Sequence, residues 1–155
     1  MAFGSPMLTP NINLSSKTVL VTGAAGFIGA NLVKRLFADV EDIRVVGLDS
    51  LNDYYDVTLK QERLREIDSL ARNWRFVKGN LADKALVESL FAEEGFALVV
   101  NLAAQAGVRY SITNPDAYVE SNLIGFYNIL EACRNHPVEH LVYASSSSVY
   151  GSNAK

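Results

Sequence analysis

The chain has 155 residues, of which 49% are hydrophobic and 20% are charged, which suits one globular domain with a buried core. A net charge of −3 argues against a broad nucleic-acid interface, and a single cysteine excludes a disulfide framework or a cysteine metal cluster. The sequence shows no apolar run long enough to cross a membrane, no signal peptide and no metal-site spacing, so we expect a cytoplasmic protein.

Residues 1–16 are predicted to be an irregular leader, because prolines, asparagines and serines interrupt any periodic pattern there. The first six residues, MAFGSP, resemble the remnant of an expression tag. We therefore set this leader apart and expect one domain over residues 17–155.

Short apolar runs alternate with amphipathic segments along the rest of the chain. They predict strands at 17–22, 43–48, 75–78, 97–102 and 140–144, and helices at 26–38, 58–71, 84–94 and 116–135. This alternation predicts an α/β fold, a doubly wound parallel sheet of the Rossmann type. Right-handed crossovers with a reversal after the third strand give the order 3-2-1-4-5. Ligands of such sheets bind where the winding reverses, at the carboxyl ends of the first and fourth strands.

The predicted helix at 58–71 carries a thin apolar stripe among many charges. Leu59, Leu64, Ile67 and Leu70 stand between Lys60, Glu62, Arg63, Arg65 and Glu66. Such a density of charge is typical of a solvated helix face, so we expect no binding patch on this helix.

A glycine-rich turn follows the first predicted strand. Gly23, Gly26 and Gly29 have the spacing G-x-x-G-x-x-G, and an apolar helix begins within it. Free N–H groups at a helix N-terminus bind anions, so we predict a pyrophosphate site here. Gly23 would adopt the turn, Gly26 would let the phosphates approach, and Gly29 would let the helix pack on the strand. The alternative is a glycine-rich turn without a ligand, because three glycines alone are a weak signal.

Asp49 ends the second predicted strand, 20 residues after Gly29. A carboxylate at this place can accept hydrogen bonds from both hydroxyls of an adenosine ribose, and it repels a 2′-phosphate. No arginine stands among the three residues that follow, Ser50, Leu51 and Asn52, so we predict NAD rather than NADP. An ordinary cap or turn residue is the alternative for Asp49.

Small or polar residues also follow the other predicted strands. Asn80 follows the third strand, residues 103–105 follow the fourth, and serines 145–148 follow the fifth. The small residues after the fourth strand would let a nicotinamide ring and its ribose lie against the backbone. The convergence of these clusters at one edge of the sheet favours a single dinucleotide site more strongly than any one motif does.

Four segments together resemble the extended short-chain dehydrogenase/reductase superfamily: residues 23–29 (GAAGFIG), Asn80-Leu81, residues 101–105 (NLAAQ) and residues 145–151 (SSSSVYG). The resemblance runs from about residue 17 to residue 151 and is closest to the NAD-dependent nucleotide-sugar epimerases and dehydratases. Residues 49–56 (DSLNDYYD), Leu59-Lys60, Arg63-Leu64 and residues 105–111 (QAGVRYS) are similar to UDP-glucuronate 4-epimerases.

The resemblance implies cofactor contacts at the matching positions. Phe27 and Ile28 would give backbone amides to the pyrophosphate, while Asp49 and Asn52 would hold the adenosine ribose. Asn80 and Leu81 would lie beside the adenine. The residues implied to line the nicotinamide half are Leu102, Ala103, Ala104, Gln105 and Ser121.

The resemblance also implies contacts to a UDP-sugar substrate. Ser146 matches the catalytic serine that hydrogen-bonds the sugar hydroxyl being oxidised. Ser147 and Ser148 would face the sugar, and Arg109 would pair with an anionic group. The alternatives are a solvated loop cation for Arg109 and a plain strand exit for the serines.

The superfamily uses a Tyr-x-x-x-Lys pair on the next helix, and none of the seven tyrosines here has a lysine four positions later. We therefore expect the cofactor-binding amino-terminal part of an NAD-dependent nucleotide-sugar 4-epimerase, truncated before its catalytic helix and inactive alone. The resemblance implies a homodimer through the helix at 116–135 when the protein is full-length. One alternative is a 4,6-dehydratase, whose acid pair usually occupies the positions of Ser147 and Ser148; the other is a non-catalytic NAD-binding module.

Overall fold

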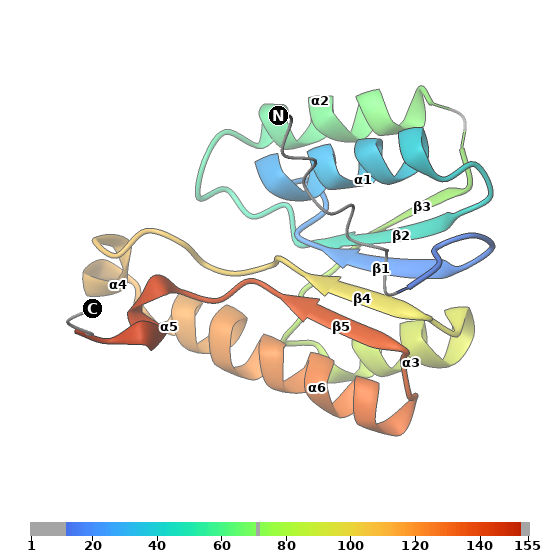
Figure 1. Cartoon of the computed structure of the whole chain (residues 1–155). Coiled ribbons are helices and arrows are strands. Elements are labelled where there is room, and N and C mark those ends of the chain that lie inside the picture. The colour runs from blue at the N-terminus through green and yellow to red at the C-terminus, as the bar shows by residue number, and fades with distance from the viewer. Residues whose placement is uncertain (1–11, 71, 153–155) are drawn as a thin grey trace, which may run out of the picture.

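Five parallel strands form one sheet in the computed structural model, which describes residues 12–70 and 72–152. The strands are β1 (Thr18–Thr22), β2 (Arg44–Asp49), β3 (Trp74–Lys78), β4 (Leu98–Asn101) and β5 (His140–Tyr143). Their spatial order is β3-β2-β1-β4-β5, which confirms the predicted 3-2-1-4-5 sheet (Figure 1). Every strand boundary lies within one residue of its prediction. Most of the predicted leader, residues 1–11, lies outside the described residues.

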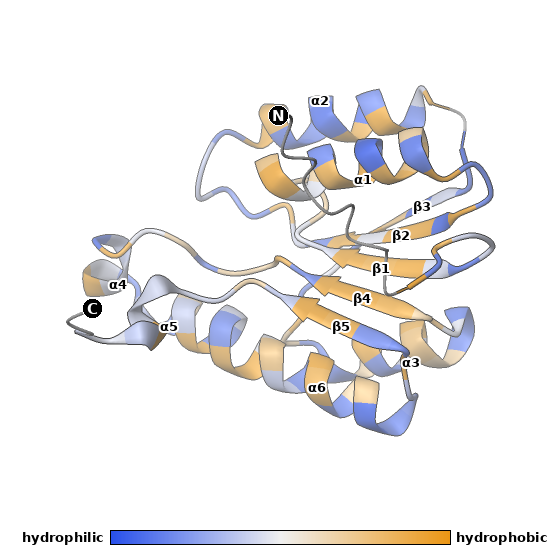
Figure 2. Cartoon of the chain, viewed as in Figure 1, coloured by the Kyte–Doolittle hydropathy of each residue, from blue (hydrophilic) through white to orange (hydrophobic). Residues whose placement is uncertain are grey.

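Helices cover both faces of the sheet. Helices α1 (Phe27–Asp39) and α2 (Val57–Asp68) lie on one face, while α3 (Lys84–Glu94) and α6 (Phe126–Asn135) lie on the other (Figure 1). Successive strand residues point to opposite faces, so Val19 and Val21 pack on the α1 side and Leu20 packs on the α3 side. Both faces are therefore apolar, which Figure 2 shows as continuous orange along β1 and β4.

The ends of α3 follow from its flanking residues. The Asp83 side chain accepts a hydrogen bond from the Leu86 amide at 3.0 Å and so caps the helix N-terminus. Gly95, with a φ of +58°, ends the helix in the left-handed conformation that glycine adopts without strain.

The predicted helix at 116–135 has the expected extent but not a uniform geometry. It consists of α5 (Pro115–Tyr118), the π-helical segment η1 (Val119–Gly125) and α6. The π-helical segment packs closely against Leu81 at its last residue, Gly125. A Cβ on Gly125 would lie 2.8 Å from the Leu81 Cβ. A short helix, α4 (Tyr110–Thr113), also forms where a loop was expected, because the periodic pattern is too short to reveal four residues.

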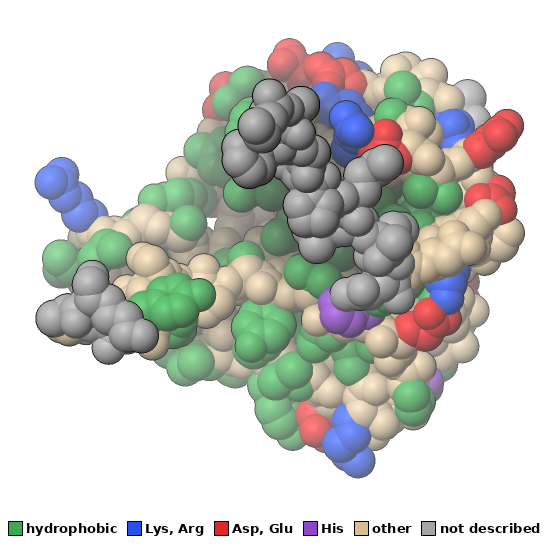
Figure 3. Space-filling model, in the orientation of Figure 1, with side chains coloured by type: hydrophobic (Ala, Val, Ile, Leu, Met, Phe, Trp, Pro, Cys, Tyr) green, Lys and Arg blue, Asp and Glu red, His purple; other side chains and the backbone are tan. Residues whose placement is uncertain are grey.

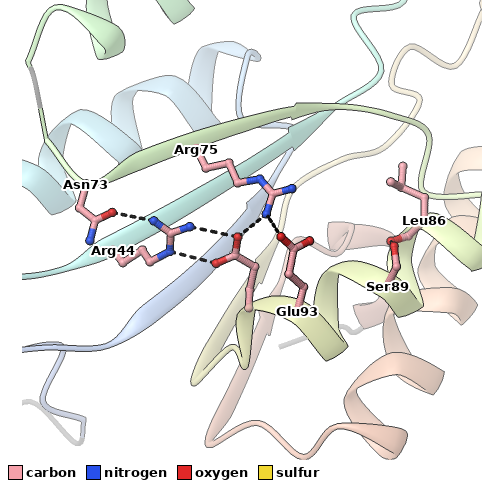
Figure 4. A network of polar contacts seen from close by, with 7 residues as sticks. Arg44, Asn73, Arg75, Leu86, Ser89 and Glu93 are labelled. Carbon is pink, nitrogen blue, oxygen red and sulfur yellow. Dashed lines mark hydrogen bonds and ion pairs between the residues drawn. The ribbon is translucent and has the colours of Figure 1, made fainter.

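An ion-pair network holds the amino ends of two strands to the end of α3. The Glu94 carboxylate accepts hydrogen bonds from Arg44 Nε at 2.9 Å and Nη2 at 3.0 Å, and from Arg75 Nη1 at 2.6 Å. Arg44 also donates to Asn73, and Arg75 reaches Glu93 (Figure 4). The Glu94 side chain is only 6% exposed, and its pKa lies below the ordinary value, first because of the hydrogen bonds from Arg44. This network lies at the amino ends of the strands, on the side of the sheet opposite their carboxyl ends.

Candidate functional site

A cleft of about 440 Å³ opens at the carboxyl ends of the strands, where the winding reverses between β1 and β4. The structure brings all fourteen residues predicted to contact the cofactor to its wall. They are Gly23, Gly26, Phe27, Ile28, Gly29, Asp49, Asn52, Asn80, Leu81, Leu102, Ala103, Ala104, Gln105 and Ser121. Their individual contacts with a cofactor stay predictions, but the chain places them around one cavity.

The glycine turn between β1 and α1 has no room for a side chain at Gly23 or Gly29. Gly23 has a φ of +67°, and a Cβ on Gly29 would lie 2.1 Å from the Gly23 carbonyl oxygen. This close approach places the first turn of α1 directly above the end of β1. By helix geometry, the amides of Phe27 and Ile28 have no carbonyl partner in a preceding turn. Both residues line the cleft, so their N–H groups are available to an anion there.

Asp49 ties the glycine turn to the loop that follows β2. Its Oδ2 accepts a hydrogen bond from the Ala25 amide at 3.1 Å, and its Oδ1 accepts one from the Leu51 amide at 2.9 Å. Leu51 has a φ of +52°, a conformation that costs a branched residue free energy and that this hydrogen bond helps to hold. Asp49 is thus a turn residue as well as a wall of the cleft, and each oxygen keeps a lone pair for a ligand.

Thr22 and Asn101 join the ends of β1 and β4, and sequence reasoning missed both residues. The Thr22 hydroxyl donates to Asn101 Oδ1 at 2.6 Å and accepts hydrogen bonds from the Leu102 and Ala103 amides, each at 3.1 Å. Thr22 and Asn101 are cross-strand partners in the predicted strand order, which is the signal that would have paired them. These hydrogen bonds hold the backbone of Leu102 and Ala103, which lines the cleft, beside the start of the glycine turn.

Side chains from η1 hold two further walls of the cleft. Asn122 Oδ1 accepts a hydrogen bond from the Gln105 amide at 2.8 Å, and Asn122 Nδ2 donates to the Gln105 carbonyl at 3.0 Å. Glu120 accepts a hydrogen bond from Asn80 Nδ2 at 2.7 Å. Helical periodicity in the sequence gives no sign of these contacts, because it does not show which distant residue a polar side chain reaches.

Helix α2 contributes two cations to the cleft, which shows that the expectation of a purely solvated charged helix was wrong. Lys60 is only 4% exposed and donates from Nζ to the Asn52 carbonyl at 2.9 Å and to Asn52 Oδ1 at 2.7 Å. Arg63 Nη1 donates to the Tyr55 hydroxyl at 3.1 Å and to the Ala25 carbonyl at 3.3 Å. Burial lowers the pKa of Lys60, and the nearby Asp49 carboxylate partly opposes this shift.

The predicted substrate residues do not line the cleft. Ser146, Ser147 and Ser148 are exposed, and η2 (Ser147–Tyr150) begins within the serine run. Ser146 Oγ lies 3.1 Å from Ser148 Oγ and accepts a hydrogen bond from the Ser148 amide at 3.2 Å. Arg109 is exposed at the start of α4. Ala144, which precedes the serine run, does line the cleft. The serine run therefore begins at the margin of the cleft.

Two classes of site find no support in the described part of the chain. No group of three or more His, Cys, Asp or Glu residues among residues 12–70 and 72–152 is arranged to hold a metal ion. No helix in these ranges has both the length and the apolar character that a membrane span requires.

Residues 19–155 match the family described as "NAD dependent epimerase/dehydratase family". Among curated relatives, the chain is 50% identical over 135 residues to "Protein CapI" of Staphylococcus aureus, which covers 87% of this chain and 39% of the relative. It is 48% identical over 140 residues to "UDP-glucuronate 4-epimerase 3" of Arabidopsis thaliana, which covers 89% of this chain and 31% of the plant protein. The chain thus spans well under half the length of these relatives.

Two solved structures that resemble this chain are also those of UDP-sugar 4-epimerases. A mutant UDP-glucuronic acid 4-epimerase from Bacillus cereus, in complex with a fluorinated UDP-glucuronic acid and NAD, superposes with a TM-score of 0.76 at 30% identity, over 89% of this chain and 43% of that chain. UDP-glucose 4-epimerase from Thermotoga maritima, with UDP-glucose, gives a TM-score of 0.73 at 30% identity, over 89% of this chain and 41% of that chain.

Proposed function

The chain belongs to the NAD-dependent epimerase/dehydratase family, and from this premise we propose that it forms the cofactor-binding part of a nucleotide-sugar 4-epimerase. The proposed reaction interconverts UDP-glucuronate and UDP-galacturonate through a transient 4-keto sugar. Its support is the single cleft that gathers the fourteen predicted cofactor residues, together with the 48% identity to a plant UDP-glucuronate 4-epimerase.

The cleft suits NAD, the cofactor of this family, in shape and in polarity. A side chain on Gly29 would collide with the Gly23 carbonyl, and the glycine turn therefore brings the amides of Phe27 and Ile28 to the cleft wall. These donors suit a pyrophosphate. The Asp49 carboxylate, 8% exposed, offers acceptors that suit the ribose hydroxyls.

The chain's own residues would bind and orient the substrate at the margin of this cleft. NAD, when bound, supplies a reversible hydride acceptor. Ser146 would hydrogen-bond the sugar hydroxyl that is oxidised, with Ser147 and Ser148 beside the sugar. Arg109, exposed before α4, would pair with an anionic group of the UDP-sugar.

The 155-residue chain contains no Tyr-x-x-x-Lys pair, so it lacks the group that would take the proton from the sugar hydroxyl. We therefore expect no turnover of UDP-glucuronate by this polypeptide alone. Product formation by the purified 155-residue chain, followed by chromatography of the nucleotide sugars, would refute that expectation.

An apolar stripe on the helix at 116–135 supports a homodimer of the longer protein. Val119, Leu123, Tyr127 and Leu130 recur at helical spacing and are exposed, Leu123 at 65%. Hydrophobic side chains also gather over β5 and α6 in Figure 3. Sedimentation of the longer protein tests this proposal, because Leu123→Arg would shift a dimer to monomer, whereas a monomeric wild type would contradict it.

Calorimetric titration with NAD tests the cofactor site in the 155-residue chain. We expect wild type to bind and Asp49→Ala to weaken binding by about tenfold or more, because two charge-assisted hydrogen bonds are lost. Ser146→Ala is the matched control and should leave the affinity unchanged. Wild type that does not bind NAD, or Asp49→Ala that binds equally well, would contradict the proposed site.

A further inference from the structure

Three tyrosine rings join two loops that follow different strands. Tyr54 lies in the loop between β2 and α2, while Tyr110 begins α4 and Tyr118 ends α5. The ring centroids of Tyr54 and Tyr110 are 4.9 Å apart, and those of Tyr110 and Tyr118 are 6.3 Å apart. Aromatic rings at these distances attract one another. We call this cluster of three tyrosines the aromatic bridge.

The aromatic bridge crosses the cleft. Its two loops follow β2 and β4, and β1 lies between these two strands in the sheet (Figure 1). Tyr54 lines the cleft on the β2 side, and Ala106 lines it on the β4 side. A contact between the two loops therefore spans the part of the cleft at the glycine turn, which follows β1.

The two loops approach each other closely at Gly107. This residue has a φ of +93°, and a Cβ there would lie 2.2 Å from the Tyr54 hydroxyl oxygen. Glycine adopts this left-handed backbone without strain, and it also leaves room for the end of the Tyr54 side chain. The approach of the two loops therefore depends on having no side chain at position 107.

Each loop is anchored on its own side of the cleft. On the β4 side, the Tyr118 hydroxyl donates to the carbonyls of Ala106 and Gly107. On the β2 side, Lys60 Nζ donates to the Asn52 carbonyl at 2.9 Å and to Asn52 Oδ1 at 2.7 Å. These hydrogen bonds hold each loop to its own helix and do not join one loop to the other.

The contact between the two anchored loops is made by side-chain packing. Among the described residues, no hydrogen bond joins residues 50–56 to residues 102–113. Tyr54 is 43% exposed, so its ring can rotate into solvent. Separating the two loops therefore breaks ring contacts but no hydrogen bond between them, which makes the contact readily reversible.

We propose that the aromatic bridge is a latch over the bound dinucleotide, and that NAD enters and leaves the cleft while Tyr54 is separated from Gly107 and Tyr110. The inference rests on the proposed function, which places the NAD pyrophosphate at the glycine turn. Closure of a loop over a bound ligand limits the rate of its release in many enzymes. Tyr54 thus sets the rates of NAD binding and release.

A latch changes rate constants in a way that a ligand contact does not. If NAD passes the bridge in both directions, removing the bridge speeds association and dissociation together, and the dissociation constant changes little. Loss of a side chain that only contacts NAD raises the dissociation rate constant alone and weakens binding by the same factor. The two rate constants together therefore distinguish a latch from a contact.

Stopped-flow mixing of the 155-residue chain with NADH measures both rate constants, because the fluorescence of the reduced cofactor reports its binding and excess NAD then displaces it. We expect Tyr54→Ala to raise the association and dissociation rate constants by about tenfold each, with a dissociation constant within about threefold of wild type. Tyr54→Phe keeps the ring and should retain the wild-type rates. Ile112→Ala, which removes an exposed side chain of α4, should also retain them.

Gly107→Ala tests the bridge from the opposite loop. Its added Cβ would displace the Tyr54 ring, so both rate constants should again rise. In the Tyr54→Ala background the same substitution should add nothing, because the ring that it displaces is gone. Gly95→Ala is the matched control: Gly95 also has a positive φ, of +58°, but an added Cβ there would meet no described atom within 4 Å.

The outcomes separate the latch from the proposed function. If Tyr54→Ala leaves both rate constants unchanged, or raises only the dissociation rate constant, the latch is overturned while the cofactor site stands. If Tyr54→Ala does not fold, unchanged rate constants in Gly107→Ala overturn the latch equally. If wild type binds neither NADH nor NAD, the proposed cofactor site fails and the latch fails with it.

Discussion

The two ends of the cleft are built differently. At the β1 and β2 end, Thr22 and Asp49 are buried, and their side chains are hydrogen-bonded to neighbouring backbone amides. At the β5 end, the serine run is exposed and Tyr150 is 73% exposed. Among the described residues, the side-chain hydrogen bonds of the run link Ser146 only to Ser148. The first end is held by hydrogen bonds to neighbouring backbone, whereas the side chains of the second end are exposed.

Strand position explains the difference. β1 is central and pairs with β2 and β4, so its carboxyl end is surrounded by loops from three strands. β5 is an edge strand of the described sheet and pairs only with β4. Cofactor binding and substrate chemistry should therefore respond separately to mutation, and four substitutions test this separation.

The largest expected effect is that of Gly29→Ala at the enclosed end. The added Cβ would lie 2.1 Å from the Gly23 carbonyl, and backbone cannot move aside as a flexible side chain can. We expect a loss of about 3 kcal/mol in the free energy of unfolding, measured by urea denaturation. Ala30→Gly on the same helix gives a control for helix propensity. A Gly29→Ala protein as stable as wild type would show that the turn is looser than described.

Thr22→Val removes a hydroxyl while keeping the shape of the side chain. It would leave Asn101 and the amides of Leu102 and Ala103 without a buried partner. We expect a loss of about 2 kcal/mol in stability together with weaker NAD binding. Thr18→Val, at the other end of the same strand, is the control. If NAD affinity stays constant in Thr22→Val, this link does not shape the cleft.

Glu94→Gln tests a stabilising network away from the cleft. We expect a loss of only about 1 kcal/mol near neutral pH, because both arginine partners are partly exposed to solvent. NAD affinity should not change.

The pH dependence of Glu94→Gln has a defined sign. The folded pKa of Glu94 lies below the ordinary value of 4.5, so its contribution is present above that pH and is lost as the pH falls through the folded pKa. Wild type should therefore lose more stability than Glu94→Gln on acidification below about pH 4.5. Parallel acid unfolding curves for the two proteins would contradict this role.

The smallest effect is expected for Ser146→Ala at the exposed end. Removing the hydroxyl should change both stability and NAD affinity by less than about 0.5 kcal/mol, because within the described part of the chain it hydrogen-bonds only to Ser148. Calorimetry and urea denaturation check the two quantities. A marked loss of NAD affinity would show that the two ends of the cleft are not separable.

Much of the fold was predictable because hydrophobic periodicity is a local property. The five strands alternate with helices in a pattern that defines the sheet order, and the glycine spacing marks the turn above β1. The cofactor wall was also predictable, because residues at the carboxyl ends of parallel strands meet at one edge.

The remaining features depend on contacts between distant segments. Asn122, which hydrogen-bonds to Gln105, lies in a π-helical segment that no repeat in the sequence indicates. Lys60 did carry a signal, since it stands four residues before Leu64 and seven before Ile67, on the buried stripe of α2. A charged residue at a buried helical position indicates a partner or a ligand. The prediction of a solvated helix considered only how many charges the helix carries and not the position of Lys60 on its buried face.

The most direct test of the central claim is a titration of the 15N-labelled 155-residue chain with NAD, followed by amide NMR. Binding at the enclosed end predicts the largest shifts at the amides of Phe27 and Ile28, with further changes at Ala25 and Leu51, which Asp49 holds. The amides of residues 147–150 should shift least. Shifts confined to residues 147–150, or no shifts at saturating NAD, would contradict the account.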